Sequence, residues 1–389
     1  MKKLFVFIVI LFNLSTYSQI NEVFILVKDS QTDKELANAP IFIKEINRSG
    51  ATNAFGVFKL SLSSQATLEI NLSNYTPIQL STALLTERLN IIYLDPIVNS
   101  NTEKVVTVNH PYKLLTDLVQ NSKNQLKTPI ELQVYVLELF KANNIYFSFN
   151  DGLLNFYVKD KNNKINTDII VQQNRFNSIV GSFFSDNIMG YNLNGLMNNN
   201  YKFDQLNELF LDNNYTKYNF LFTELEGTPQ YNNINIELKD SINEALPNYD
   251  IIYDPVKMLI INVKATIPTQ VLQYAKPKKV NNREVELCYY TFELNYTTTS
   301  NVYHFASLTD KIGVVEHKVN IPNYMEVTNY FVVDKINTMP VNYNHKEVFK
   351  QKSLNKAKTK YYNKYWESRL PLSKEQTDFI QQLSSKTLN

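Results

Sequence analysis

Residues 284–296 read EVELCYYTFELNY, and this stretch decides the class of fold. Val285, Leu287 and Tyr289 occupy alternate positions, and the positions between them are also partly apolar. Successive side chains of a β-strand point to opposite faces of its sheet, so both faces of this strand are expected to be partly buried. The stretch therefore predicts a long strand inside a packed sheet.

Further alternating runs lie on both sides of this strand. Helical patterns do not separate them, which argues against a parallel doubly wound sheet, because its strands need helical crossovers. Residues 309–313, TDKIG, predict a turn between antiparallel neighbours. The runs expected to form strands are 218–225, 234–238, 258–263, 302–308, 313–319 and 327–333. We expect a meandering, curved antiparallel sheet, an order of strands that resembles the open half-barrel of periplasmic lipoprotein carriers.

The N-terminal part of the chain shows short β-type runs separated by turn residues, the rhythm of a small β-sandwich. Phe58, Leu60 and Leu62 share one face of their run, while the residues between them are polar and point away. The runs expected to form strands are 23–28, 41–46, 57–62, 67–72 and 89–94. These half-buried strands predict a two-layered β domain.

One family resemblance lies within this segment. It rests on Val27-Lys28-Asp29, Thr32, Ala39-Pro40-Ile41-Phe42-Ile43, Thr52-Asn53-Ala54-Phe55-Gly56-Val57-Phe58 and Asn74-Tyr75. At these residues the segment resembles the carboxypeptidase regulatory-like domain, a transthyretin-like β-sandwich frequent at the N-terminus of secreted Gram-negative envelope proteins. The match covers about residues 22–96. It implies a fold and a location but no activity, because the module carries no catalytic residues in its relatives.

The first residues have the organisation of a secretory signal peptide. Two lysines precede an apolar run from Leu4 to Phe12, and small side chains follow at Thr16 and Ser18. We predict cleavage after Ser18. The apolar run is too short to span a bilayer core, which takes roughly twenty residues, and no later stretch approaches that length. The mature chain is therefore expected to be exported, without a transmembrane span.

The composition argues against two further classes of function, nucleic-acid binding and phosphate or nucleotide binding. The chain has 389 residues, with 39 Lys or Arg and 37 Asp or Glu. Without Lys2 and Lys3 the two signs balance at 37 each, which removes a general attraction to nucleic acid. Only 8 Gly are present, too few for the Gly-rich loops that hold phosphates. We therefore expect no cofactor and no nucleic-acid partner.

The segment between the two β regions predicts helices and loops. Pro111 suits a helix start, and a second helix is expected from Ile130 to Lys141. A strand, a tight turn at Asp151-Gly152 and another strand should follow. Residues 159–214 are rich in Asn and predict a long loop with one helix near 203–211.

The C-terminal residues predict two helices. Leu354, Ala357, Tyr361 and Tyr365 recur at helical spacing, and residues 373–376 have the pattern of a capping box. The fold class expected for the whole chain is mainly β (α+β). We divide it into a signal peptide 1–18, a β-sandwich 19–97, a linker and helical connector 98–165, an antiparallel β domain with an Asn-rich loop 166–344 and a basic helical tail 345–389.

Local motifs assign no reaction centre. His110, His304, His317 and His345 do not have the spacing of zinc ligands, and His304 is interpreted as an ordinary strand residue. A Gly-x-Ser-x-Gly nucleophile motif is missing. Cys288 lies in an apolar strand, where burial should raise its pKa and leave it inert. We therefore assign no catalytic, cofactor-binding or metal residue.

The basic tail supplies the one candidate contact surface. Lys356, Lys360, Lys364 and Trp366 could bind anionic lipid headgroups or an acidic partner surface. The competing interpretation is a surface helix whose lysines are solvated and whose aromatic residues pack on the sheet, and we favour it.

These patterns favour an exported, non-enzymatic protein of the cell envelope, in the periplasm, at the outer membrane or secreted. It would bind or scaffold an envelope protein, or hold a lipid-like ligand in the concavity of the large domain. Two alternatives stay open: a secreted hydrolase with a carboxylate pair in the large domain, and a surface adhesion protein. Paired carboxylates in a polar cleft would favour the hydrolase, and an apolar concavity without titratable residues would favour the carrier.

Overall fold

The computed structural model describes residues 21–386 with the exception of 38, 47, 54, 63, 73–74, 97–103, 106–107, 162–163, 179–191, 212, 226–230, 281–282, 319–320, 340–341 and 359–371. The predicted signal peptide, two residues of the family resemblance (Ala54 and Asn74) and the central part of the predicted tail lie outside the described residues.

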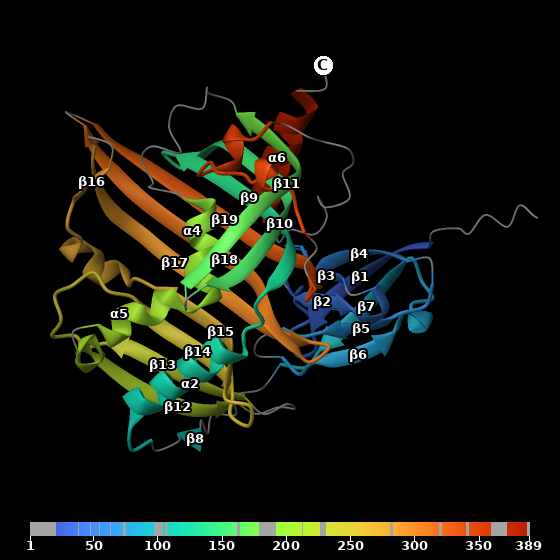
Figure 1. Cartoon of the computed structure of the whole chain (residues 1–389), viewed down its shortest axis with the longest axis horizontal. Coiled ribbons are helices and arrows are strands. Elements are labelled where there is room, and N and C mark those ends of the chain that lie inside the picture. Colours follow the sequence, from blue (N-terminus) through green and yellow to red (C-terminus); the bar gives the residue numbers. More distant parts are fainter. Residues whose placement is uncertain are drawn as a thin grey trace, which may run out of the picture.

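The protein is mostly β, as predicted, with a small sandwich beside one large curled sheet (Figure 1). The first layer of the sandwich has the order β4-β1-β7, and the second has the order β6-β5-β2-β3. The strands are β1 (Asn21–Asp29), β2 (Pro40–Ile43), β3 (Arg48–Ala51), β4 (Val57–Leu62), β5 (Thr67–Ile70), β6 (Ile78–Ser81) and β7 (Leu89–Leu94).

The sandwich core forms where the alternating residues of the two layers meet. Ile25 and Val27 of β1 and Phe58 and Leu60 of β4 are buried against Leu68 of β5. These positions are two residues apart along each strand, so their side chains lie on the same face. The predicted sandwich and the shared face of Phe58 and Leu60 are confirmed.

The large sheet is antiparallel and has the order β8-β12-β13-β14-β15-β17-β18-β19-β9-β10-β11, with β16 beside β17. It curls into a half-barrel. Its first long strand in the chain, β9, pairs with its last, β19, so β9, β10 and β11 continue the sheet beyond the C-terminal strand. The strands are β8 (Lys104–Val105), β9 (Ile130–Ala142), β10 (Ile145–Lys161), β11 (Lys164–Ser178), β12 (Tyr218–Leu225), β13 (Tyr231–Leu238), β14 (Asn248–Asp254), β15 (Leu259–Thr266), β16 (Lys278–Val280), β17 (Arg283–Thr299), β18 (Val302–Lys318) and β19 (Ile321–Asn337).

The helix predicted from Ile130 to Lys141 is wrong, because these residues form β9. Val134 and Val136 face the inside of the curl, whereas Tyr135 and Leu137 pack on its outer face. A strand that is buried on both faces is apolar at nearly every position, and periodicity alone does not separate it from a buried helix. The long strands of the large sheet consequently begin at Ile130, and the expected boundary at residue 166 falls within β11.

Three further sequence expectations are corrected in the same sheet. The long loop predicted over 159–214 contains the strand β11. The turns predicted at Asp151-Gly152 and at 309–313 lie in the middle of β10 and β18, which continue through them. Asp151 is held there by two hydrogen bonds from the Nε and Nη2 atoms of Arg175 on β11. A cross-strand partner thus overrides a local turn preference.

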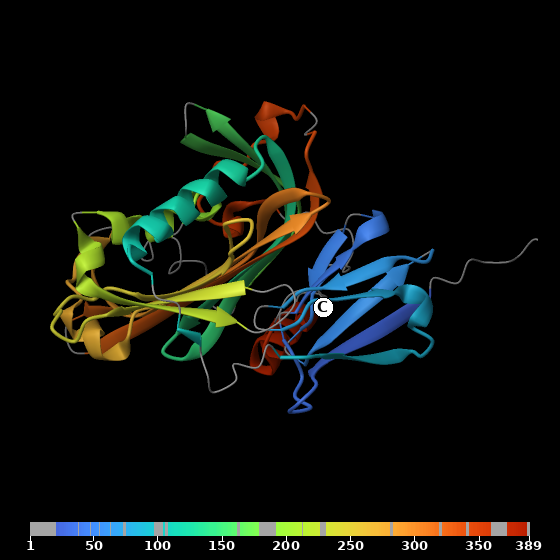
Figure 2. The same ribbon diagram turned by 90° about the horizontal axis from the view of Figure 1, so that it is seen from below.

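Helices cover both faces of the large sheet. The inner face carries α2 (Pro111–Gln125), α4 (Leu193–Tyr201) and α5 (Asn207–Phe210), and α2 can be followed over the sheet in Figure 2. The outer face carries the C-terminal helix α6 (Lys374–Lys386) over β9 and β10. The helices predicted at Pro111 and after Ser373 are confirmed. Short 3₁₀ turns complete the chain: η1 (Lys44–Ile46), η2 (Thr82–Leu84), η3 (Asp204–Leu206), η4 (Asn214–Lys217), η5 (Thr269–Tyr274), η6 (His345–Glu347) and η7 (Leu354–Lys356).

The predicted capping box forms at the start of α6. The Ser373 Oγ atom accepts a hydrogen bond from the Gln376 amide, and the Gln376 Oε1 atom accepts one from the Ser373 amide. The preceding tail helix, predicted from the spacing of Leu354 and Ala357, is only the 3₁₀ turn η7 in its described part. Tyr361 and Tyr365 lie outside the described residues.

The sandwich joins the half-barrel through β3, which forms a bridge from Arg48 to Lys335 of β19. The Arg48 guanidinium lies 3.4 Å from the buried carboxylate of Asp334. This contact places the sandwich against the outer face of the large sheet, opposite the helices that cover the inner face. Among the described helices, not one combines the length and the apolar character that crossing a bilayer requires.

Candidate functional site

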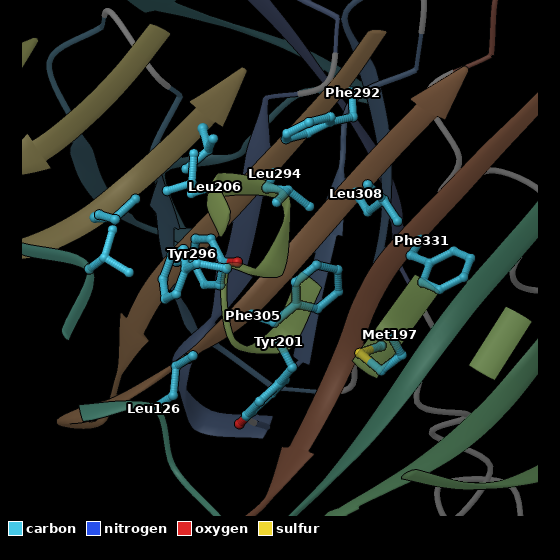
Figure 3. Close-up of a cluster of buried hydrophobic side chains, with 14 of the residues drawn as sticks. Leu126, Met197, Tyr201, Leu206, Phe292, Leu294, Tyr296, Phe305, Leu308 and Phe331 are labelled. Atoms are coloured by element: carbon cyan, nitrogen blue, oxygen red, sulfur yellow. The ribbon is translucent and has the colours of Figure 1, made fainter. Parts of the chain in front are cut away.

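The inner face of the half-barrel is a continuous apolar surface. It takes alternate residues from nearly every strand of the sheet, and Figure 3 shows its central part. Phe292 and Leu294 of β17 lie beside Leu308 of β18 and Phe331 of β19, and all four are buried. Alternation along each strand collects these side chains on one side, which makes the inner face the largest apolar surface of the described chain.

Two helices form most of the cover over this surface. Leu115, Leu118 and Val119 of α2 follow the three- and four-residue spacing of one helix face and are buried in the same cluster. Met197 and Tyr201 lie one turn apart on α4, and both are completely buried in the cluster that Figure 3 shows. The cover is thus made of segments that contribute no strand to the sheet beneath it.

Three tyrosine hydroxyl groups donate to backbone oxygens in and beneath the cover, and one of them connects the sheet to α4. Tyr296 of β17 donates a hydrogen bond to the carbonyl oxygen of Asn200 on α4. Tyr201 donates to the carbonyl oxygen of Lys127, and Tyr303 donates to that of Ile260. Burial raises the pKa of all three hydroxyl groups well above the ordinary value. They therefore act here as neutral donors, which satisfy backbone oxygens inside an apolar region.

A third part of the cover comes from residues 349–357, which we call the C-terminal strap. The Phe349 amide donates to the Ile169 carbonyl oxygen of β11, and the Lys352 carbonyl oxygen accepts from the Leu193 amide of α4, each at 2.8 Å. Leu354 is completely buried in the inner apolar cluster. The strap therefore connects the edge strand β11 to α4, and its Leu354 side chain packs in the inner apolar cluster.

A row of buried polar side chains crosses the inner face. Asp310, Asn329, Glu138 and Asn150 are cross-strand partners on β18, β19, β9 and β10 in turn. Asn329 donates to the Asp310 carboxylate at 3.2 Å, and Asn150 donates to the Glu138 carboxylate. Ser353 of the strap donates to the same Glu138 oxygen at 2.8 Å. We call these four strand residues the polar row.

The polar row is held in an environment that disfavours charge. Glu138 is 0% exposed and Asp310 is 4% exposed. Burial raises the pKa of Asp310 to about 6, although the hydrogen bond from Asn329 acts in the opposite direction. Among the described residues, the side-chain oxygens of Asn150 and Asn329 have no hydrogen-bond partner. The inner face is therefore apolar with a narrow polar belt, and the concavity contains titratable groups.

A separate cleft of about 120 Å³ lies between the sandwich and the outer face of the large sheet. Phe42 and Ser49 line it from the sandwich, and Glu293, Asn295 and Ser307 line it from β17 and β18. Asn295 donates to the Ser307 hydroxyl at 3.0 Å. The thickness of the sheet separates this cleft from the inner apolar face.

Two of the residues weighed from sequence, His304 and Cys288, lie in ordinary strand positions. His304 lies buried in β18, with its ring nitrogens 2.7 Å from the Phe305 carbonyl oxygen and 3.1 Å from the Thr299 hydroxyl. Burial raises the pKa of the half-buried Cys288 thiol to about 11, as predicted. Within the part of the chain that is described, His, Cys, Asp and Glu side chains do not converge as a metal site.

The tail residues proposed as a contact surface are largely untested by the structure. Lys356 is exposed at the end of the C-terminal strap. Lys360, Lys364 and Trp366 lie outside the described residues. The structure therefore brings Lys356 next to the cover of the inner face and leaves the surface as a prediction.

Sequence reasoning missed the polar row, although one signal of it is present. Val134, Val136 and Glu138 are two residues apart and therefore share the inner face. Glu138 thus stands at a position where the alternation calls for an apolar residue. Asp310 follows Leu308 in the same way. A carboxylate at a position that should face the apolar side of a sheet indicates either a buried polar partner or a functional site.

The described fold defines a half-barrel protein with a covered apolar inner face and a docked sandwich. No protein-family model matches the chain, and no curated protein matches it either.

Proposed function

We propose that this chain is an exported, non-enzymatic protein of the cell envelope that binds an apolar or amphiphilic ligand on the inner face of its half-barrel. The observation that carries the proposal is the construction of the cover. Helices α2 and α4 and the C-terminal strap pack on a continuous apolar surface without adding a strand to it. Such segments can separate from the sheet without breaking its hydrogen-bonded ladder.

Opening the cover exposes apolar side chains, so a ligand must offset the free energy that their burial contributes. Leu118 of α2, Met197 of α4 and Leu354 of the strap are each completely buried, and burial of such a side chain stabilises the closed form by about 1.5–3 kcal/mol. An alkyl chain of ten carbons that binds in their place contributes about 8 kcal/mol, at roughly 0.8 kcal/mol per methylene group. A single-chain ligand can thus offset the exposure of roughly three or four cover side chains.

The N-terminal part supports an envelope role for the protein. The sandwich docks on the outer face of the large sheet through the Arg48–Asp334 ion pair, which leaves it available as a fixed module for a partner protein. Its sequence resemblance to carboxypeptidase regulatory-like domains and the predicted signal peptide point to export. We propose that the sandwich provides location or partner binding, while the half-barrel binds the ligand.

The direct test is recovery of the ligand. The full chain is expressed with its own N-terminus in a Gram-negative host, purified from the envelope fraction without detergent and examined by native mass spectrometry. We expect a species heavier than the chain by the mass of one small amphiphile, which organic extraction removes. Repeated recovery of the bare chain, together with failure to bind added alkyl probes, would contradict the proposal.

The second candidate is a hydrolase, and the polar row is the observation that favours it. Asp310 and Glu138 are separated by one intervening strand, which places their backbones two strand spacings apart, roughly 10 Å. Inverting glycosidases hold two carboxyl groups about 6.5–9.5 Å apart. Hydrolysis of nitrophenyl glycosides by the wild-type chain, abolished in Glu138→Gln, would support this candidate. Equal background rates for both proteins would reject it.

A further inference from the structure

A polar cavity opens at the rim of the half-barrel, where α2 and α4 end close together. Its volume is about 550 Å³, within the roughly 300–1,000 Å³ of small-molecule sites. Lys123 and Gln120 line it from α2, and Lys202 and Asp204 line it from the segment after α4. Asp160 lines it from the end of β10. This rim cavity is distinct from the cleft between the sandwich and the sheet.

Two lysines and two aspartates line the rim cavity, so their charges balance, and Lys123 is the lysine without an ion-pair partner among the described residues. The Lys202 ammonium lies 2.6 Å from the Asp160 carboxylate, and Asp204 accepts a hydrogen bond from the Asn207 amide group at 3.1 Å. Lys123 is half-buried, and no described carboxylate lies within ion-pair distance of its ammonium group. Burial lowers the pKa of Lys123, an effect that Asp204 partly offsets. A half-desolvated ammonium group without a partner gains from binding an anion.

The wall of the rim cavity is also the end of the inner apolar cluster. Leu126 and Tyr201 line the cavity and belong to that cluster, with exposed fractions of 5% and 0%. Figure 3 shows the two side chains together at one end of the cluster, with Met197 and Phe305 beyond them. A polar chamber with a cation therefore adjoins the apolar interior directly.

We infer that the rim cavity is the headgroup site for an anionic, single-chain amphiphile whose alkyl chain enters the half-barrel between Leu126 and Tyr201. The inference rests on the proposed function and narrows it to ligands that carry a negative headgroup. Lys123 forms the ion pair with that headgroup. The alkyl chain then takes the place of cover side chains on the inner face.

The test uses the purified full chain, with decanoate and decanol as matched probes that differ in headgroup charge. Calorimetric titrations are run on the wild type, Lys123→Gln, Lys123→Arg and Lys113→Gln. Lys113 lies on the exposed side of the same helix and pairs with Asp117, so its replacement controls for loss of a positive charge from α2. Urea unfolding curves show whether each variant keeps the wild-type fold.

We expect Lys123→Gln to weaken decanoate binding by about tenfold or more, the effect of losing a hydrogen bond to a charged group, and to leave decanol binding unchanged. Lys123→Arg and Lys113→Gln should bind decanoate like the wild type. Equal decanoate binding by Lys123→Gln and the wild type would overturn the headgroup assignment while leaving the proposed function intact. Failure of the wild type to bind either probe would overturn both.

Discussion

Replacement of Asp310 by asparagine should change the pH dependence of stability in a way set by the burial of the polar row. Burial raises the pKa of Asp310 from 3.8 to about 6, so the folded chain holds a proton that the unfolded chain releases. The stability that this proton provides is fully present below the unfolded pKa and is lost as the pH rises through about 6. The full difference corresponds to roughly 3 kcal/mol, because one pKa unit is about 1.36 kcal/mol.

Between pH 4.5 and 7.5 about 2 kcal/mol of this difference should be lost. Asparagine does not titrate, so the free energy of unfolding of the wild type, relative to Asp310→Asn, should fall by that amount over this range. His304 acts in the opposite direction, since burial lowers its pKa from 6.5 to about 4, and its contribution grows as the pH rises from about 4 to the unfolded pKa. It is present in both proteins and therefore cancels in the comparison.

The assay is urea unfolding at several pH values, with linear extrapolation of the free energy to zero denaturant. Glu237→Gln serves as the matched control, because Glu237 is an exposed carboxylate on β13 of the same sheet. Because Glu237 is exposed, its replacement should change the free energy of unfolding by no more than about 0.5 kcal/mol. A constant difference for Asp310→Asn would refute the reasoning, since it would mean that Asp310 has the same pKa in the folded and unfolded chain.

The remaining predictions concern single contacts. Ser353→Ala should lower the free energy of unfolding by about 1–3 kcal/mol, since the hydroxyl bonds the buried Glu138 and Asn150; an unchanged urea midpoint would contradict this. Leu118→Ala should destabilise by about 2–5 kcal/mol in the same assay, whereas the matched change at the 70% exposed Leu84 should have little effect. The Cys288 thiol should resist iodoacetamide at pH 8, because its pKa is about 11, and react after urea unfolding; rapid alkylation of the native chain would disprove its burial.

Alternation was sufficient to predict the sheet but not the length of its strands. Val285 to Tyr296 lies within β17, and the sequence placed it correctly in a long strand. Asp151-Gly152 and the TDKIG segment have residues that favour turns, yet β10 and β18 run through both. Each aspartate has its partner on a neighbouring strand, Arg175 for Asp151 and Asn329 for Asp310. Such partners are visible only once the strands are paired.

The candidate site was harder to predict for the same physical reason. The members of the polar row and Ser353 are far apart in the sequence, and register alone brings Glu138 to Asn150 and Asn329. The helix start at Pro111 and the capping box at Ser373 depend on neighbours within four residues, so both could be predicted. Local patterns thus predicted these two helix starts, whereas the inner face, its cover and the rim cavity depend on how the sheet curls.

Binding in the proposed site requires the cover to leave the inner face. Hydrogen–deuterium exchange of the full chain with and without decanoate tests it most directly, because it follows opening segment by segment. We predict faster exchange in α4 and in the C-terminal strap when the ligand is bound, with unchanged protection in β17, β18 and β19. Saturating ligand that leaves the exchange of both cover segments unaltered, or that opens the sheet strands instead, would contradict it.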